Sequence, residues 1–247
     1  MVRPYRGDLH NHTLLSPCGD IEMTPRFIVN AAKDAGFSIV GISDHNTTRQ
    51  CEEIYHLASE EGIMILCGAE ICTKEEVHCL SFVEDFSKLI KLQEYLSKYL
   101  PCIHNDPERF GYQVWVDRNE TIVGEEEYLL ISAIEQSLDE VEKFVHYLDG
   151  IFIPAHIDKS KYSILSQLGF IPFDLNVDSL EISKRCNLEE FVDKNKYLGR
   201  YNFIRSSDAH YREDFGKTIC NFYLENLTFS EIKMALKGEE GRRVEIL

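Results

Sequence analysis

The stretch TPRFIVNAAKDAGFSIVGISDHN, residues 24–46, contains a complete helix–strand unit followed by two polar side chains. A threonine suited to the N-cap, a proline at the first helical position and a glycine stop predict a helix over residues 24–36. The apolar run SIVGIS, residues 38–43, predicts a buried strand. Asp44 and His45 directly follow this strand. Repeated units of this kind are typical of a parallel sheet covered by helices.

The same alternation continues over the rest of the chain. Further helices are predicted over residues 47–62, 86–100, 137–150, 187–195 and after Ser230, and further strands over 63–70, 77–83, 151–158, 178–183, 202–207 and 242–247. About seven such units fit a closed or distorted barrel. Two β-rich runs within residues 111–126 predict a hairpin-like insertion near 101–136. Residues 1–247 are expected to form one domain.

The formal net charge of −16, from 26 Lys and Arg against 42 Asp and Glu, argues against a long basic groove. Duplex nucleic acid is therefore not expected as a partner. Small phosphorylated substrates stay compatible with this charge, because bound divalent cations reverse the local field. No apolar run approaches about 20 residues, and the N-terminus lacks the apolar segment of a signal peptide. We therefore expect a cytoplasmic protein with no membrane partner.

Side chains able to bind a metal follow five of the predicted strands at the point where each strand ends. They are His10 and His12, Asp44 and His45, Glu70, His156, and Asp208 with His210. His78 is less regular, because it lies at the start of its strand. The remaining histidines, His56, His104 and His146, are assigned no role in the site. The carboxyl ends of parallel barrel strands meet at one mouth, so we expect the strand-end side chains to converge there.

The expected ligands are imidazoles and carboxylates without a thiolate cluster, which suits Zn²⁺, Mn²⁺ or Fe²⁺ in a catalytic site. The full set is His10, His12, Asp20, His45, Glu70, His78, His156, Asp208 and His210. One catalytic zinc uses about three protein ligands, so two or three divalent metal ions are expected. Glu70 is the candidate bridge between two of them.

Five short motifs, in this order along the chain, resemble those of the PHP (polymerase and histidinol phosphatase) superfamily. They are DLHNH (8–12), SDHN (43–46), GAE (68–70), PAHID (154–158) and SDAH (207–210). The resemblance implies an α/β fold, a distorted (βα)₇ TIM-like barrel with a small insertion. It also implies three ligand sets: His10, His12, Glu70 and Asp208; Glu70, His78 and His156; and Asp20, His45 and His210. Asp44 is expected to orient groups around the metals rather than to bind them.

The loop after His12, LLSPCGDIEMTP, departs from the family pattern. Alignment on the start of the next helix places Asp20 at the ligand position, whereas alignment on the HxH motif places Cys18 near it. Asp20 is preferred, because the helix start is the firmer landmark.

The resemblance implies hydrolysis of a phosphoester by attack of a metal-bound hydroxide, with Glu70, Asp208 and His210 as catalytic residues. Five cationic side chains near strand ends are candidates for binding the substrate phosphate. They are Lys159, Lys184, Arg185, Arg205 and Arg212.

The expected substrate is a nucleotide or the end of a short single-stranded RNA. The insertion could cap the barrel mouth, where Tyr112 and Trp115 could stack on a base, although packing in a small hairpin core is the favoured explanation for these two residues. Two other functions stay open: a histidinol-phosphate phosphatase, and a non-catalytic metal-binding scaffold module. A metal-dependent amidohydrolase on a similar barrel fits the GAE and SDAH motifs poorly.

Overall fold

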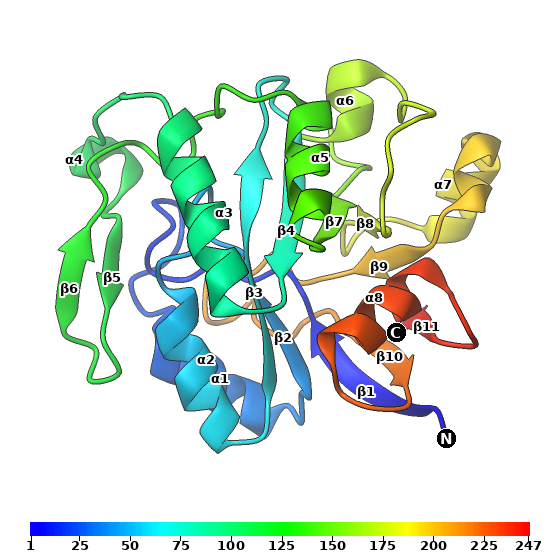
Figure 1. Cartoon of the computed structure of the whole chain (residues 1–247), viewed down its shortest axis with the longest axis horizontal. Coiled ribbons are helices and arrows are strands. Elements are labelled where there is room, and N and C mark those ends of the chain that lie inside the picture. The colour runs from blue at the N-terminus through cyan, green and yellow to red at the C-terminus, as the bar shows by residue number, and fades with distance from the viewer.

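Seven strands form one curved sheet at the centre of the computed structural model, which describes residues 1–247 (Figure 1). In their order across the sheet they are β11 (Arg243–Ile246), β10 (Cys220–Leu224), β1 (Arg3–Asp8), β2 (Ile39–Ile42), β3 (Met64–Cys72), β4 (His78–Val83) and β7 (Ile151–Pro154). A parallel pair, β8 (Leu180–Ile182) and β9 (Phe203–Arg205), contacts β7 on one side and β11 on the other. This pair bridges the two edges of the large sheet, and the expected distorted TIM-like barrel is confirmed.

The strands of the large sheet do not all run in one direction. β1, β2 and β3 are parallel, but β4 runs antiparallel to both β3 and β7, and β10 antiparallel to β1. The expectation of a wholly parallel sheet is therefore wrong. Residues 73–77 are too few for a crossover helix, so β3 and β4 pair as a hairpin. The reversal places His78, the first residue of β4, opposite Cys72 at the carboxyl end of β3.

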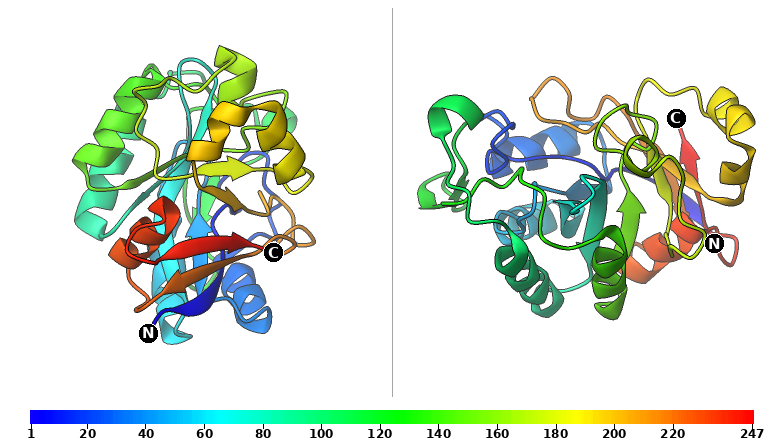
Figure 2. Two further views of the ribbon diagram at one scale, coloured as in Figure 1. Left: turned by 90° about the vertical axis from the view of Figure 1, so that its right-hand side faces the viewer. Right: turned by 90° about the horizontal axis from the view of Figure 1, so that it is seen from above.

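Five longer helices pack against the sheet and surround it on its outer side (Figure 2). They are α1 (Pro25–Asp34), α2 (Cys51–Glu60), α3 (Phe86–Tyr99), α5 (Leu138–Tyr147) and α8 (Phe229–Lys237). α1 begins where the sequence predicts, because the Thr24 side chain accepts the amide hydrogen of Phe27. The longest helix, α3, has 14 residues, and none has the length and hydrophobicity of a membrane-spanning segment.

Shorter elements occupy the connections between strands. They are α4 (Pro107–Phe110), α6 (Ile164–Leu168), α7 (Leu188–Lys194) and the 3₁₀ helix Lys196–Arg200. Of these, only α7 is predicted from the sequence. Strand β10 is also missed, although its residues alternate between buried and half-buried positions as a strand with one covered face should.

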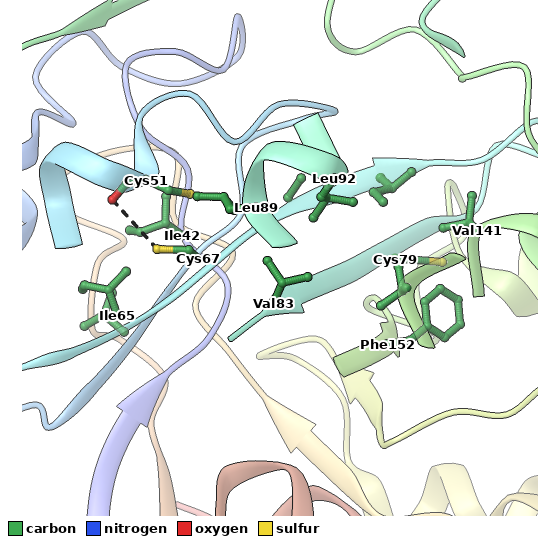
Figure 3. Close-up of a cluster of buried hydrophobic side chains, with 14 of the residues drawn as sticks. Ile42, Cys51, Ile65, Cys67, Cys79, Val83, Leu89, Leu92, Val141 and Phe152 are labelled. Atoms are coloured by element: carbon green, nitrogen blue, oxygen red, sulfur yellow. Dashed lines mark hydrogen bonds between the residues drawn. The ribbon is translucent and has the colours of Figure 1, made fainter. Parts of the chain in front are cut away.

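A buried apolar layer joins the helices to the sheet (Figure 3). Leu92 of α3 and Val141 of α5 belong to the same fully buried cluster as Phe152 of β7 and Val83 of β4. Each fully buried side chain of this size contributes about 1.5–3 kcal/mol to folding. This packing holds the strands, and hence the loops at their ends, in fixed relative positions.

The predicted hairpin insertion is confirmed as β5 (Val114–Val116) paired antiparallel with β6 (Ile122–Glu125). It is anchored on the start of α2, where the Gln50 side chain donates to the Val116 carbonyl and accepts its amide hydrogen, both at 2.9 Å. The Arg49 guanidinium also lies over the Trp115 ring. In Figure 1 the hairpin lies at the far left, on the opposite side of the molecule from β8 and β9.

Candidate metal centre

Eight of the nine predicted ligands gather at the edge of the barrel that the carboxyl ends of β1, β2, β3, β7 and β9 form. His10 and His12 follow β1, His45 follows β2, and Glu70 lies near the end of β3. The antiparallel β4 brings His78 to the same edge. His156 follows β7, and Asp208 with His210 follows β9. All are buried except Asp208 and His210, which are partly exposed.

Glu70 is the centre of this group, because five imidazole rings surround its carboxylate. The Oε1 atom lies 2.9 Å from His78 Nδ1, 3.1 Å from His156 Nε2 and 3.4 Å from His10 Nε2. The Oε2 atom lies 3.2 Å from His45 Nδ1 and 3.3 Å from His12 Nε2. The carboxylate expected to bridge two ions is therefore the one that most of the predicted ligands share.

Asp208 forms the second focus of the group. Its Oδ1 atom lies 3.4 Å from His10 Nε2 and 3.6 Å from both His12 Nε2 and His210 Nδ1. Its Oδ2 atom accepts a hydrogen bond from the Lys159 ammonium. Asp208 is thus shared between the imidazoles and a cation on the loop after β7.

Three overlapping clusters have ligand atoms close enough to hold a metal ion, within 4.8 Å of one another. They are His12, His45 and His210; His10, His12 and Asp208; and His45, Glu70 and His78. His10 Nε2 and His12 Nε2 face each other at 3.2 Å. His45 Nδ1 is buried without a hydrogen bond, although it lies next to Glu70. Converging ring nitrogens beside carboxylates are the donor set of Zn²⁺, Mn²⁺ or Fe²⁺, so these residues fit divalent metals.

The electrostatics of the centre keep Glu70, His45 and His210 in the form that binds a metal, whereas neighbouring carboxylates outweigh burial and raise the pKa of His10 and of His12. Burial raises the pKa of Glu70, but His78, His10 and His45 outweigh it and hold that pKa well below its usual range. Burial and the neighbouring His12 hold the pKa of His45 well below the ordinary value and that of His210 at about 4. An ionised carboxylate and neutral imidazoles are the metal-binding forms of these side chains.

Asp44 does not belong to the clusters but supports one of their members. Its carboxylate accepts hydrogen bonds from the Thr13 amide at 2.7 Å and from the Ser16 hydroxyl at 2.7 Å. The same Ser16 hydroxyl lies 3.0 Å from His12 Nδ1. Asp44 can therefore orient His12 through Ser16, and its role beside bound metals stays a prediction.

A second buried carboxylate, Glu181 of β8, has no role in the sequence analysis. Its two oxygens lie 3.1 and 3.0 Å from His10 Nδ1, and Oε2 accepts the His156 amide hydrogen at 2.9 Å. Glu181 thus orients one imidazole and the backbone of another. The sequence does place this glutamate within the apolar strand predicted over residues 178–183. A glutamate is seldom buried without a partner, so its position in such a strand indicates a buried contact.

Three candidate ligands are absent from the clusters: Asp20, Cys18 and His156, of which only His156 contacts Glu70, at 3.1 Å. The Asp20 carboxylate accepts the amide hydrogen of Glu22 at 2.8 Å. Its own amide donates to the His210 carbonyl at 2.8 Å, which ties the loop to a cluster residue. Cys18 is an exposed free thiol. The assignment of Asp20 as a ligand stays a prediction.

The backbone is strained at two of the candidate ligands. His156 has φ of 31° and Asp208 has φ of 50°, in the left-handed region that non-glycine residues seldom adopt. Each such residue costs about 1–3 kcal/mol, and such positions gather at functional sites.

Two adjoining cavities open beside the centre. The larger, about 460 Å³, is lined by Glu70, four histidines, Lys159, Lys161, Tyr162, Asp208 and Ser160. The smaller, about 320 Å³, is lined mainly by residues 181–185 and 206–208. The two cavities share His156, Lys159 and Asp208. The centre is therefore accessible to a small substrate from one side.

The predicted phosphate-binding cations divide into two groups. Lys159, Lys184 and Arg185 line the smaller cavity. Arg205 instead donates to the Cys186 carbonyl at 2.6 Å, and Arg212 lies over the Phe27 ring beside Glu22. Neither lines the two cavities, so their assignment to substrate binding stays a prediction.

The aromatic residues of the insertion are also placed away from the centre. Trp115 lines a separate cavity with Arg49, and neither it nor Tyr112 lines the two beside Glu70. Their distance from the two cavities does not favour stacking of a substrate base on Tyr112 or Trp115, which stays a prediction.

Residues 8–168, more than half of the chain, match the model of the PHP domain. The chain is 24% identical to the uncharacterized protein YqxK of Bacillus subtilis, over 89% of this chain and 56% of that protein. It is 36% identical over 102 residues to the uncharacterized protein MJ1587 of Methanocaldococcus jannaschii, over 38% of this chain and 60% of that protein. The matches thus span little more than half the length of these relatives.

Several solved structures share the fold. The lesion-specific endonuclease PfuEndoQ of Pyrococcus furiosus superposes with a TM-score of 0.72 and 20% identity, covering 98% of this chain and 58% of that one. Endonuclease Q bound to a 27-mer duplex with an abasic lesion at the active site gives 0.71 and 21%, with the same coverage. A Bifidobacterium adolescentis protein with a proposed metal-dependent phosphoesterase activity gives 0.57 and 22%, covering 92% and 93%. At these identities the likeness shows the fold alone.

The expectation that duplex nucleic acid is excluded as a partner is wrong. Endonuclease Q has this fold and binds a duplex at its active site. The expectation relied on a net charge of −16, which sums over the whole chain. Binding depends on the field near the site, where cationic side chains and bound metals can reverse the sign.

Proposed function

This chain belongs to the PHP domain family, a family of phosphoester hydrolases, and we propose that it is itself a metal-dependent phosphoesterase. The observation that carries the proposal is the arrangement of five imidazoles around the buried carboxylate of Glu70. The adjoining cavities and their cations support an anionic substrate.

Two or three divalent ions, Zn²⁺, Mn²⁺ or Fe²⁺, fit this site. We assign His10, His12, Glu70 and Asp208 to one ion, and Glu70, His78 and His156 to a second. His45 and His210 are assigned to a third, together with Asp20. Divalent ions supply Lewis acidity towards phosphoryl oxygens and lower the pKa of water, so that a nucleophile is available near neutral pH.

The protein side chains would position the substrate and hold charge. Lys159 lies where both cavities meet, so its ammonium can bind a phosphoryl oxygen, and Lys184 and Arg185 can bind a second anionic group nearby. Glu70 and Asp208, whose carboxylates lie between the imidazoles, would keep the metal ligands at fixed distances from one another. His210 is neutral near pH 7, because its pKa is about 4, and its partly exposed ring faces the larger cavity.

The proposed substrate is a nucleotide or the end of a short RNA. A second candidate substrate is DNA, which the protein would cleave within a strand. Endonuclease Q, a lesion-specific endonuclease, has the same fold over 98% of this chain. The experiment below also tests two other functions, a histidinol-phosphate phosphatase and a non-catalytic scaffold.

The test is phosphate release by the protein reconstituted with Mn²⁺, using adenosine 3′,5′-bisphosphate and histidinol phosphate side by side. A duplex with an abasic site tests strand cleavage. Turnover that disappears in Asp208→Asn but persists in Asp139→Asn supports the proposal. Asp139 is a matched control, because its carboxylate is exposed and pairs only with Lys143. Absence of turnover on all three substrates, with metal bound, would favour the scaffold.

A further inference from the structure

Tyr162 is an aromatic residue at the rim of the candidate metal centre. It lies between β7 and α6 and lines the larger cavity together with Lys159 and Lys161. Its side chain stacks on the His78 ring, with centroids 4.8 Å apart and planes 20° apart. The residue is nevertheless 44% exposed. A large apolar ring is thus held open to solvent next to the expected reaction site.

The backbone of Tyr162 is held in an unusual conformation. Tyr162 has φ of 56°, which is rare for a bulky residue and costs free energy. Its carbonyl accepts the amide hydrogen of His78 at 2.9 Å, and Ser163 directly after it caps α6. The fold therefore maintains an unfavourable conformation that presents an aromatic side chain to the cavity.

Two lysines lie beside Tyr162, of which Lys159 pairs with Asp208 of the same cavity and Lys161 forms no ion pair. The segment KSKY, residues 159–162, places two lysines next to the ring in a chain of net charge −16. Both lysines line the same cavity as Tyr162. Cationic side chains beside an exposed aromatic ring are typical of surfaces that bind nucleotide phosphates and stack their bases.

We propose that Tyr162 is the platform on which the substrate base stacks, which makes this residue the determinant of preference for substrates with a base. The inference rests on the proposed phosphoesterase function and adds to it the residue that distinguishes a nucleotide from a base-free phosphoester. Lys161 contributes charge towards the phosphates but carries no preference for a base.

A different role for Tyr162 is to position His78 alone. In that case loss of the ring would disturb the metal centre and weaken all phosphorylated ligands by the same factor. Stacking of a base predicts instead that only ligands with a base are affected. The two roles are separated by comparing a nucleotide with the same molecule lacking its base.

The experiment measures equilibrium binding of adenosine 5′-monophosphate and of ribose 5-phosphate by calorimetry. It uses the metal-free protein and the Mn²⁺-loaded protein, in the wild type, Tyr162→Phe and Tyr162→Leu. Tyr211→Leu is the matched control, since Tyr211 is 47% exposed and adjacent to His210 but lines neither cavity. Circular dichroism and Mn²⁺ content confirm that each variant folds and binds metal.

We expect the wild type to bind the nucleotide about 5- to 150-fold more tightly than ribose 5-phosphate, the range for stacking one base on an aromatic ring. Tyr162→Phe and Tyr211→Leu should keep this preference, and Tyr162→Leu should lose it without a change in ribose 5-phosphate affinity. The proposal is overturned if Tyr162→Leu keeps the preference for the nucleotide, or if this variant binds both ligands more weakly by the same factor. It is also overturned if the wild type binds neither ligand or binds both equally. Phosphate release from ribose 5-phosphate by the wild type shows separately whether the phosphoesterase function stands.

Discussion

Two groups of imidazole and carboxylate side chains lie at opposite ends of β7, the metal centre and a partly buried group around His146, and they differ in how their charges are satisfied. At the metal centre, five imidazoles share one carboxylate, and His10 Nε2 faces His12 Nε2 at 3.2 Å. At the amino end of β7, each nitrogen of His146 has its own carboxylate. His146 Nδ1 lies 2.5 Å from Glu142, and Nε2 lies 3.1 Å from Asp178.

The second group, the His146 cluster of Glu142, His146, Asp178 and Lys237, is complete in itself. Lys237 pairs with Asp178 at 3.2 Å, and the Phe152 amide donates to the same carboxylate at 2.7 Å. Two carboxylates and two cationic side chains balance when His146 is protonated. At the metal centre, several ring nitrogens share one carboxylate and have no carboxylate each of their own. The metal centre therefore fits divalent cations, whereas the His146 cluster does not.

The largest loss of metal binding is expected on substitution of Glu70, because its carboxylate is the one that five imidazoles of the metal centre share. Glu70→Gln removes the negative charge that five imidazoles share, so metal affinity should fall by more than the roughly 10–100-fold seen when a supporting residue is removed. Phosphate release should disappear with it. Metal content after dialysis and turnover with Mn²⁺ measure both. Retention of two or more ions by this variant would contradict the assignment of Glu70 as the shared ligand.

The His146 cluster should respond in the opposite way. Asp178→Ala leaves Lys237, His146 and the Phe152 amide without their partner, which should cost about 3 kcal/mol of folding free energy. Urea denaturation of the variant measures the loss. Its Mn²⁺ content should match that of the wild type, and a lower content would mean that the two groups are coupled.

An intermediate effect is expected at Glu181, which supports the metal centre without belonging to the clusters. Glu181→Gln keeps the size of the side chain but weakens its hold on His10, so metal affinity should fall by about 10–100-fold. Titration with a competing chelator measures the affinity. The nearby Asp158→Asn is the control, because its carboxylate bonds to Ser183 and not to a candidate ligand.

The smallest effect is a pH dependence of stability at the His146 cluster. Partial burial lowers the pKa of His146, but the carboxylates of Asp178 and Glu142 outweigh it and raise that pKa above the ordinary 6.5. The stabilisation is therefore present in full below pH 6.5 and is lost as pH rises through the higher folded-state value. Urea midpoints of metal-loaded wild type should fall over this range relative to those of His146→Gln. Parallel curves for the two proteins would contradict the expected charge on His146.

The sequence by itself determined which side chains can bind metals and where most of them lie. His10, His12, His45 and His156 follow strands, and Glu70 lies near the end of one. Local hydrophobic patterns are sufficient to locate buried strands and their approximate ends. The ordered motifs also determined the family and, with it, the distorted barrel. These features depend on residues close together in the chain, which is why they can be read from it.

Only the tertiary structure decided the contacts between distant segments. It reversed β4, so that His78 at the start of a strand joins ligands at the ends of others. It brought Glu181 to His10 across 171 residues and Lys159 to Asp208 across 49. It also placed the ring of Tyr162 on His78, while Trp115 lies against Arg49 in a separate cavity. Such pairings depend on strand direction and packing in space, which no local pattern of residue types encodes.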